Sequence, residues 1–362
     1  MAKPASSVRS VEAPFTEEGW LINAQDGINQ EHNLGLFRAL KMYPKAVFWS
    51  IVMSTSIVME GYDTMLIGSL IAQPAFQKRY GLHLHGSKYE ILASWQAGLN
   101  NASGCGQLVG LLIAGYVSER LGFRKTMTLG LGLTSATVFI IFFAPTIGIL
   151  TAGECLFGIP LGLFQTIPVV YAMEISPMCL RPYLTTYVNF CWAIGHLIGA
   201  GILRGTLSLD NEWSYRIPFA IQWFWPLVLI PLLYFAPESP WWLVRQDRLQ
   251  EAKDTLKRLT SVNEVDFNIE KAVFLIVVTT THERAVNAST TYLACFKGTD
   301  LTRTLISIGV YCIQTLSGNP LRGYSTFFFE HAGLSSTEAF NMSIGNYALA
   351  LFGSFFSVRS VP

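Results

Sequence analysis

The sequence predicts an all-α integral membrane protein with eight membrane-crossing helices. Of its 362 residues, 51% are hydrophobic and only 14% are charged, whereas soluble domains usually carry about 25% charged residues. Apolar windows of about 20 residues, the length that crosses roughly 30 Å of hydrocarbon, recur along the chain. Because backbone groups in lipid must be satisfied internally and strand-like alternation is absent, these windows indicate helices rather than a barrel.

The expected helices lie near residues 47–70, 95–117, 126–144, 147–172, 184–204, 217–236, 304–328 and 340–358. The first six, within residues 47–236, would form one transmembrane bundle. A polar tail, residues 1–46, precedes them and lacks the apolar core of a cleavable signal peptide, so the first helix is expected to direct membrane insertion. Residues 237–303 would be a cytoplasmic loop containing a solvated charged helix at 248–260, and residues 304–362 a partial second bundle.

The distribution of Lys and Arg predicts the orientation. Most of the 25 basic residues fall in the N-terminal tail and in the connections after the second, fourth and sixth helices. Positively charged connections stay on the cytoplasmic side of a membrane. We therefore expect a multi-pass protein of the plasma membrane with its N-terminus in the cytoplasm.

The composition argues against several functional classes. The net charge is +1 and the basic residues form no dense run, which disfavours nucleic acid as a partner. The six cysteines are scattered without metal-ligand spacing and are expected to be packing residues. No nucleophile–base pair, metal cluster or phosphate-binding loop is evident, so an enzyme is disfavoured and no cofactor is expected.

Two carboxylates interrupt the first apolar window. Glu60 and Asp63 stand three residues apart in IVMSTSIVMEGYDTMLIGSL and therefore share one helix face. A charged residue at a helix centre costs about 2.5–3.5 kcal/mol on insertion scales. Adjacent carboxylates in a low dielectric cannot both ionise cheaply, so at least one is expected to hold a proton. A proton-coupling site needs this property; the alternative is structural pairing with a neighbouring helix or with water.

Short motifs lie at the ends of these windows and within the seventh. GYVSERLGFRKT (115–126) follows the second helix, EISPMCLR (174–181) the fourth and PESPWWLVR (237–245) the sixth, and IQTLSGNPLRGY (313–324) lies in the seventh. Their types and order resemble the major facilitator superfamily. Together with MEGYDT in the first helix and WSYRIPFAIQW before the sixth, they look like the sugar porters of that superfamily, and specifically like fungal maltose and general α-glucoside permeases.

The resemblance covers about residues 40–355 and implies a fold and a function. Major facilitator proteins have two six-helix bundles around a substrate site at mid-membrane. This sequence would then contain a complete N-terminal bundle and two helices of an incomplete C-terminal bundle, as in a truncated chain that does not transport alone. The implied function is symport of protons with an α-glucoside such as maltose. A sugar-sensing or interaction membrane protein without transport is the alternative.

The resemblance also implies a charge relay in which acids and bases at neighbouring helix ends hold the cytoplasmic side of the protein together. The residues at its motif positions are Gly115, Glu119, Arg120, Gly122, Arg124, Lys125, Glu174, Arg181, Glu238 and Arg245. Gly115 is expected to let two helices approach, and Trp241 stands where sugar porters have Arg. An ordinary positively charged cytoplasmic turn explains the first of these motifs equally well.

The proton and sugar positions follow from the same resemblance. Asp63 occupies the usual proton-linked position, with Glu60 beside it. Glu154 stands where many sugar porters have an Arg that pairs with this acid, so either it enlarges the proton site or the pairing is lost. Protons would be the coupling ion.

Sugar hydroxyls are bound by amide and hydroxyl groups and sugar C–H faces by aromatic rings. The matching positions hold Asn189, His196, Gln314 and Tyr324. His196 replaces a more usual Gln, and a satisfied interhelical histidine is an equally good interpretation of it. Arg322, in the seventh window, would be costly unless it meets an acid or a water-filled cavity.

Overall fold

The computed structural model describes residues 35–83, 89–261, 269–287, 295–318, 321 and 323–359. Arg322 and most of the expected tail lie outside the described residues. The elements, in chain order, are α2 (Leu36–Met42), α3 (Pro44–Leu70), α4 (Pro74–Tyr80), β1 (Leu82–His83), β2 (Tyr89–Glu90), α5 (Ala93–Leu121), α6 (Phe123–Phe142), α7 (Ile147–Ile175), α8 (Arg181–Thr206), α9 (Trp213–Ile221), α10 (Phe224–Phe235), α11 (Pro240–Arg245), α12 (Leu249–Leu259), α13 (Ile269–Asn287), α14 (Gly298–Leu316), α16 (Ser325–His331) and α17 (Ser336–Arg359).

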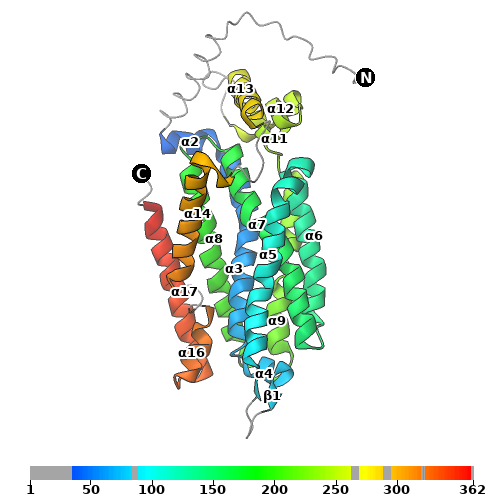
Figure 1. Ribbon diagram of the computed structural model, residues 1–362, viewed down its shortest axis with the longest axis vertical. Coiled ribbons are helices and arrows are strands. Elements are labelled where there is room, and N and C mark those ends of the chain that lie inside the picture. Colours follow the sequence, from blue (N-terminus) through cyan, green and yellow to red (C-terminus); the bar gives the residue numbers. More distant parts are fainter. Residues whose placement is uncertain are drawn as a thin grey trace, which may run out of the picture.

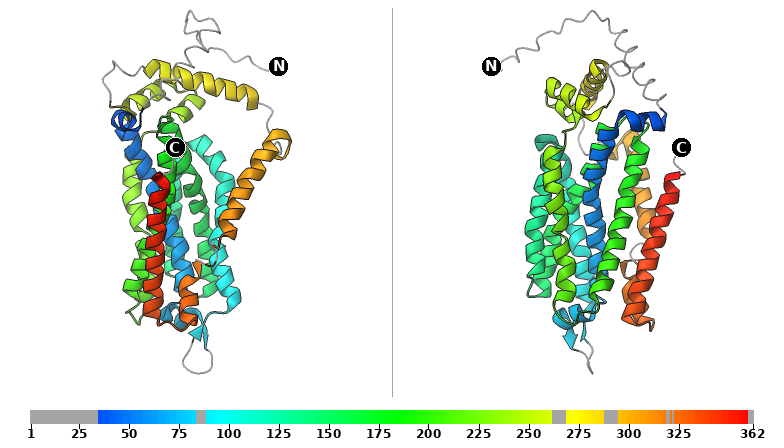
Figure 2. Two further views of the ribbon diagram at one scale, coloured as in Figure 1. Left: turned by 90° about the vertical axis from the view of Figure 1, so that its left-hand side faces the viewer. Right: turned by 180° about the vertical axis from the view of Figure 1, so that it is seen from behind.

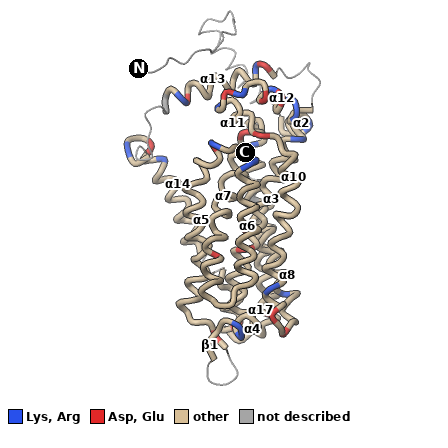
Figure 3. The backbone as a smooth tube through the Cα atoms, turned by 90° about the vertical axis from the view of Figure 1, so that its right-hand side faces the viewer, with Lys and Arg blue, Asp and Glu red and all other residues tan. Residues whose placement is uncertain are grey.

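The described residues form an all-α bundle. Helices α3, α5, α6, α7, α8 and the α9–α10 pair run along the long axis of the molecule (Figure 1), and α11, α12 and α13 lie across one end. At the other end are α4 and the small antiparallel hairpin β1–β2. Helix α3 packs against both α7 and α8, and α7 also packs against α5 and α6. Figure 3 shows charged residues mainly at the two ends of the bundle.

The bundle core consists of apolar side chains from α3 and its neighbours. Met53, Tyr62 and Leu66 of α3 and Phe157 and Phe164 of α7 are all fully buried. Helix α3 also buries polar side chains that face other helices rather than lipid. These polar residues explain why α3, although 27 residues long, is less apolar than an ordinary membrane span.

Four stretches of the described chain are long and apolar enough to cross a membrane by composition alone. They are α6, α7, α8 and the stretch Trp213–Phe235 that contains α9 and α10. Helices α3 and α5 are longer than most of these and lie beside them in the same bundle. The chain is therefore a multi-pass membrane protein in which α3 is largely buried among the other helices, whereas α5 exposes apolar side chains such as Leu108 and Leu112.

Glycines set the closest helix contacts. A Cβ atom on Gly106 of α5 would lie 1.9 Å from the carbonyl oxygen of Cys155, and one on Gly158 of α7 would lie 2.1 Å from that of Ser103. Small residues let membrane helices approach this closely. The expectation that Gly115 has this role is wrong: a Cβ atom there would meet nothing within 4 Å, because the α5–α7 contact uses the opposite helix face.

The structure divides two of the expected helices. The window at 217–236 becomes α9 and α10, which are separated at Gln222–Trp223. The window at 304–328 is interrupted after α14, where Gly318 has a φ of 96°. A positive φ is incompatible with a continuing right-handed helix and is adopted readily by glycine. Apolar length indicated helical structure in both windows, but the expectation of one continuous helix in each was wrong, because apolar length carries no information about local breaks.

Helices α14, α16 and α17 stand beside the six-helix bundle as part of a second bundle. Helix α17 packs along α8, and Arg204 Nε donates to Asn341 Oδ1 at 2.9 Å between them. Helix α14 leans away from the bundle at the end nearer α13 (Figure 2, left). No residue of α14 is buried, so it touches the rest of the described chain only lightly.

Candidate functional site

Three carboxyl groups meet inside the bundle. Glu60 and Asp63 of α3 and Glu154 of α7 are each 0% exposed. The charge on Asp63 acts on both Glu60 and Glu154. Glu154 thus stands near Asp63 as a second buried acid, and both expectations for it, a larger proton site and the loss of an Arg–Asp pair, stay predictions. Among the described residues no ion pair involves any of the three, so no described cation offsets their charge.

The hydrogen bonding of this acid cluster is incomplete. Gln222 Nε2, at the α9–α10 break, donates to Asp63 Oδ1 at 2.7 Å. The other oxygen of Asp63 and both oxygens of Glu60 and Glu154 have no hydrogen-bond partner in the described chain. Trp192 lies beside Glu60 as a potential donor, without the geometry of a hydrogen bond. Buried polar groups are normally satisfied, and unsatisfied ones mark functional positions or bound water.

A cavity of about 890 Å³ adjoins the acid cluster. Its walls come from α3, α7, α8, α14 and α17, so it lies between the six-helix bundle and the second group of helices. The residues that line it are Ile57, Glu60, Gln165, Val169, Thr185, Val188, Asn189, Trp192, Ala193, His196, Tyr311, Gln314, Thr315, Ser317, Gly318, Ala350 and Ser354. Amides, hydroxyls and aromatic rings therefore face one space, and Glu60, whose side chain is fully buried, lies in its wall.

The structure brings together three of the four expected sugar residues. Asn189, His196 and Gln314 all line the cavity, whereas Tyr324 does not. Tyr324 lies instead beside Asn100 of α5, because the chain turns after α14 and carries Tyr324 away from the α14 face that holds Gln314. Gln314 itself is exposed, since α14 stands clear of the bundle.

His196 is held firmly at the cavity wall. Its side chain is 6% exposed, and its Nδ1 lies 2.8 Å from the carbonyl oxygen of Trp192. The ring stacks on Tyr347 of α17, with centroids 5.1 Å apart and planes at 27°. The structure therefore shows the interhelical contact of this histidine, and its contact with a sugar stays a prediction.

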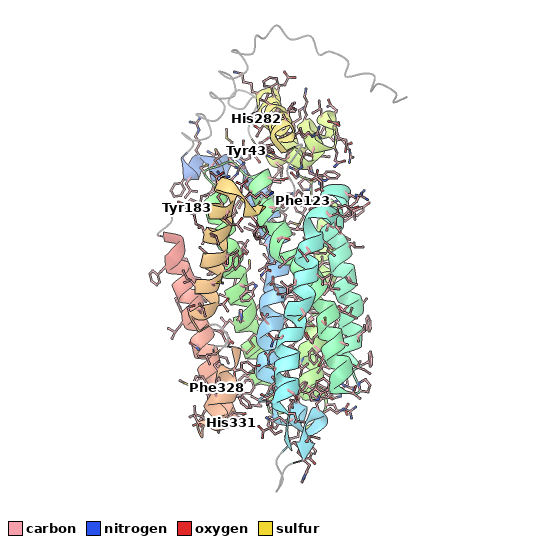
Figure 4. The ribbon with its side chains drawn as sticks, viewed as in Figure 1. Tyr43, Phe123, Tyr183, His282, Phe328 and His331 are labelled. Carbon is pink, nitrogen blue, oxygen red and sulfur yellow. The ribbon has the colours of Figure 1, made fainter. Side chains whose placement is uncertain are left out.

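Arg245 joins the expected charge relay at the other end of the bundle. Its Nε lies 3.1 Å from Glu119 Oε2 and its Nη2 lies 3.0 Å from Glu174 Oε1. Ser239 Oγ donates to the second oxygen of Glu174, and Trp242 Nε1 donates to the carbonyl oxygen of Glu119 at 2.9 Å. Helix α11 is thereby tied to the ends of α5 and α7. Figure 4 places Tyr43, Phe123 and Tyr183 at this end, opposite Phe328 and His331.

Glu238 closes the turn between α5 and α6. Its Oε1 accepts from the backbone N–H of Phe123 at 2.9 Å, and Arg124 N–H lies 3.3 Å from Oε2. Gly122 has a φ of 88°, and a Cβ atom there would lie 2.6 Å from Glu238 Oε2. Burial raises the pKa of Glu238, while the backbone donors oppose this shift. Gly122, from the motif at 115–126, and Glu238, from the motif at 237–245, therefore lie in direct contact.

The remaining relay residues have other partners. Arg181 Nε donates to the carbonyl oxygen of Ser176 at 3.2 Å, so the acid of EISPMCLR pairs with Arg245 and not with its own arginine. The guanidinium of Arg120 lies 4.3 Å from the ring centroid of Tyr116. Lys125 is exposed.

Sequence reasoning missed two polar residues of the central site. Gln222 binds Asp63, and Gln165 lines the cavity. Each is an amide within an apolar membrane-length stretch. Polar residues in such stretches usually face the bundle interior, and this signal was available in the sequence.

Comparisons with known proteins give the family. The chain is 41% identical over 342 residues to the general alpha-glucoside permease of Saccharomyces cerevisiae and 40% identical over 352 residues to its maltose permease MAL31. These matches cover 92% and 96% of this chain, but the chain spans only 56% and 57% of the two relatives. Both relatives are named as permeases, in agreement with the expectation that the chain is not an enzyme.

Solved structures give the fold. The proton:xylose symporter XylE bound to 6-bromo-6-deoxy-D-glucose is similar with a TM-score of 0.75 at 20% identity, over 88% of this chain and 70% of that one. A partially occluded inward-open structure of XylE from E. coli gives 0.70 at 19% identity, over 87% and 73%. The model of the sugar (and other) transporter family matches residues 49–361, and the chain therefore belongs to this family and has the major facilitator fold.

Proposed function

We propose that the chain carries the sugar and proton sites of a proton-coupled α-glucoside symporter. The observation that supports this most directly is the position of Glu60, which lines the polar cavity and also belongs to the buried acid cluster. A substrate in the cavity and a proton on the acids would therefore act on the same side chain.

The chemistry of the cavity suits a neutral sugar. Asn189, Gln165 and Gln314 each offer an amide donor and acceptor. Trp192 and Tyr311 supply aromatic surface that can cover the C–H face of a sugar ring. Its volume of about 890 Å³ falls within the roughly 300–1,000 Å³ of ligand sites. The names of the two yeast relatives favour an α-glucoside over other sugars.

The acid cluster suits proton binding. An ionised carboxylate without a cation is very costly in an apolar interior, so such a group takes up a proton instead. Five carboxyl oxygens of Glu60, Asp63 and Glu154 accept no hydrogen bond from the described chain. A proton can therefore bind to one of them without displacing an existing donor. Proton binding would remove like-charge repulsion within the cluster and make it compatible with its dry surroundings.

In this proposal the chain lies in the plasma membrane with its N-terminus in the cytoplasm. The end of the bundle that carries α11, α12 and α13, together with Arg245 and its acids, then faces the cytoplasm. This orientation rests on the excess of Lys and Arg in the segments at that end.

The pH dependence of sugar binding tests the proposal. We expect the purified chain to bind radiolabelled maltose more tightly at pH 5 than at pH 8, and Asp63→Asn to remove this difference because the amide mimics the protonated acid. Glu338→Gln, at an acid that is fully exposed, is the matched control and should retain the difference. Maltose binding that is equally pH-dependent in wild type and Asp63→Asn would contradict the assignment of Asp63 to the proton site. Absence of maltose binding would contradict the proposal that the cavity binds an α-glucoside.

A further inference from the structure

A second hollow lies on the outer surface of the six-helix bundle, away from the central cavity. It has a volume of about 870 Å³ and runs between α6 and α10. Both helices belong to stretches long and apolar enough to cross a membrane. The groove is therefore on the surface that meets lipid, and its position separates it from the sugar and proton sites.

The walls of this groove are apolar and open. Leu129 and Leu133 of α6 are 58% and 41% exposed, and Tyr234 of α10 is 74% exposed. Gly132 forms part of the floor, and a Cβ atom there would meet nothing within 4 Å. The space beside residue 132 is therefore open, and a larger side chain there would occupy part of the groove.

Two cations stand at one end of the groove. Arg124 and Lys125 line it where α6 begins. The Arg124 guanidinium lies 3.4 Å from the carbonyl oxygens of both Tyr234 and Ala236, which holds it at the end of α10. Glu238 also faces Arg124. Arg258 Nη2 donates to the carbonyl oxygen of Phe235 at 2.7 Å, beside these groups. Among the described residues no ion pair involves Lys125 or Arg258, so the three cations and Glu238 together carry two excess positive charges.

We propose that this groove binds one anionic phospholipid, with an acyl chain between α6 and α10 and the phosphate at Arg124 and Lys125. An apolar channel with a cationic mouth at the end of a spanning helix matches a molecule that has an anionic head and an apolar tail. The surrounding bilayer supplies such molecules at the required depth. A soluble peptide or a free phosphate lacks the tail that the apolar walls need.

Native mass spectrometry of the purified chain tests this site. We compare adducts with phosphatidylserine and with phosphatidylcholine of the same acyl chains, for wild type, Gly132→Leu, Lys125→Gln, Lys125→Arg and the control Gly104→Leu. Gly104 of α5 is also exposed, and a Cβ atom there would meet nothing within 4 Å. Glycerol phosphate, added in excess, tests whether the phosphate alone competes.

The expected result is one phosphatidylserine molecule that binds more tightly than phosphatidylcholine and is not displaced by glycerol phosphate. Gly132→Leu should lose this adduct, because the leucine fills the groove, and Gly104→Leu should retain it. Lys125→Gln should weaken phosphatidylserine binding about five-fold, the usual contribution of one basic residue near an anionic surface, and Lys125→Arg should not.

Equal affinities for the two lipids, or an unchanged phosphatidylserine adduct in Gly132→Leu, would overturn the proposal. If Gly132→Leu does not yield monodisperse protein, the two variants at residue 125 provide the test. The same phosphatidylserine affinity in Lys125→Gln and Lys125→Arg would overturn the proposal. Weaker binding in Lys125→Gln alone would support it.

Discussion

Removing the guanidinium of Arg245 should weaken the protein chiefly through one of its two ion pairs. The contacts with Glu119 and Glu174 are nearly equal in length, 3.1 and 3.0 Å. Their surroundings differ, because the Glu119 side chain is 51% exposed and that of Glu174 is 15% exposed. Solvent screens the first pair far more than the second.

The magnitudes follow from this difference. An exposed ion pair contributes about 0.2–1 kcal/mol, and we expect the Arg245–Glu119 coupling to fall in that range. A hydrogen bond to a charged group that is largely withdrawn from water contributes about 1.5–3 kcal/mol, and we expect about 2 kcal/mol for Arg245–Glu174. Arg245→Lys should not restore both contacts, since an ammonium group lacks the planar fork that reaches two carboxylates.

Two double-mutant cycles measure these couplings. One combines Arg245→Gln with Glu174→Gln and the other combines it with Glu119→Gln, with the free energy of unfolding followed by SDS titration in mixed micelles. Raising the salt concentration should reduce the Glu119 coupling more, since exposed charges are screened more strongly. A Glu119 coupling equal to or larger than the Glu174 coupling would refute the expectation that the Arg245–Glu174 pair, between α11 and α7, contributes more to stability.

Two further predictions concern packing and transport. Gly106→Ala should lower the free energy of unfolding by about 1–3 kcal/mol because of overpacking, since the new Cβ atom would lie 1.9 Å from the carbonyl oxygen of Cys155. Gly115→Ala is the matched control, because a Cβ atom there meets nothing within 4 Å. An equal effect of both variants would refute the close α5–α7 contact at Gly106. Residues 1–362 expressed alone should give no uptake of labelled maltose in a yeast that lacks maltose uptake, because no residue of α14 is buried and that wall of the cavity is weakly held. Restored uptake after fusion to the C-terminal helices of a relative would support this reason, and uptake by the chain alone would contradict it.

The sequence predicted the elements better than the contacts between them. Apolar length located the membrane helices because crossing hydrocarbon imposes a minimum span on each. The breaks at Gln222–Trp223 and at Gly318 depend on individual residues and neighbouring helices, which average hydropathy does not register. The β1–β2 hairpin of two residues per strand is too short to produce a detectable alternation.

The sequence indicated which acids are buried in the bundle, but it did not indicate which ion pairs form at the end that carries α11. Glu60, Asp63 and Glu154 could be identified as candidates because a carboxylate in an apolar window is energetically costly. In the structure the charge of Asp63 influences both glutamates. The pairing of Glu174 with Arg245, 71 residues away, was not predictable from a motif that contains Arg181 seven positions along the chain. Spacing within a motif describes the end of one helix, whereas the ion pairs of Arg245 connect the ends of α5, α7 and α11.

The position of Glu60 has a thermodynamic consequence for coupling. If a sugar in the cavity changes the free energy of protonating the acid cluster, then protonation changes the free energy of sugar binding by the same amount, because linkage between two sites is reciprocal. Glu60 offers a direct route for this linkage, since it lines the cavity and senses the charge of Asp63. Glu154 senses Asp63 but does not line the cavity. Glu60→Gln should therefore weaken the effect of sugar on proton binding more than Glu154→Gln does, even if both variants remove one titrating group from the same cluster.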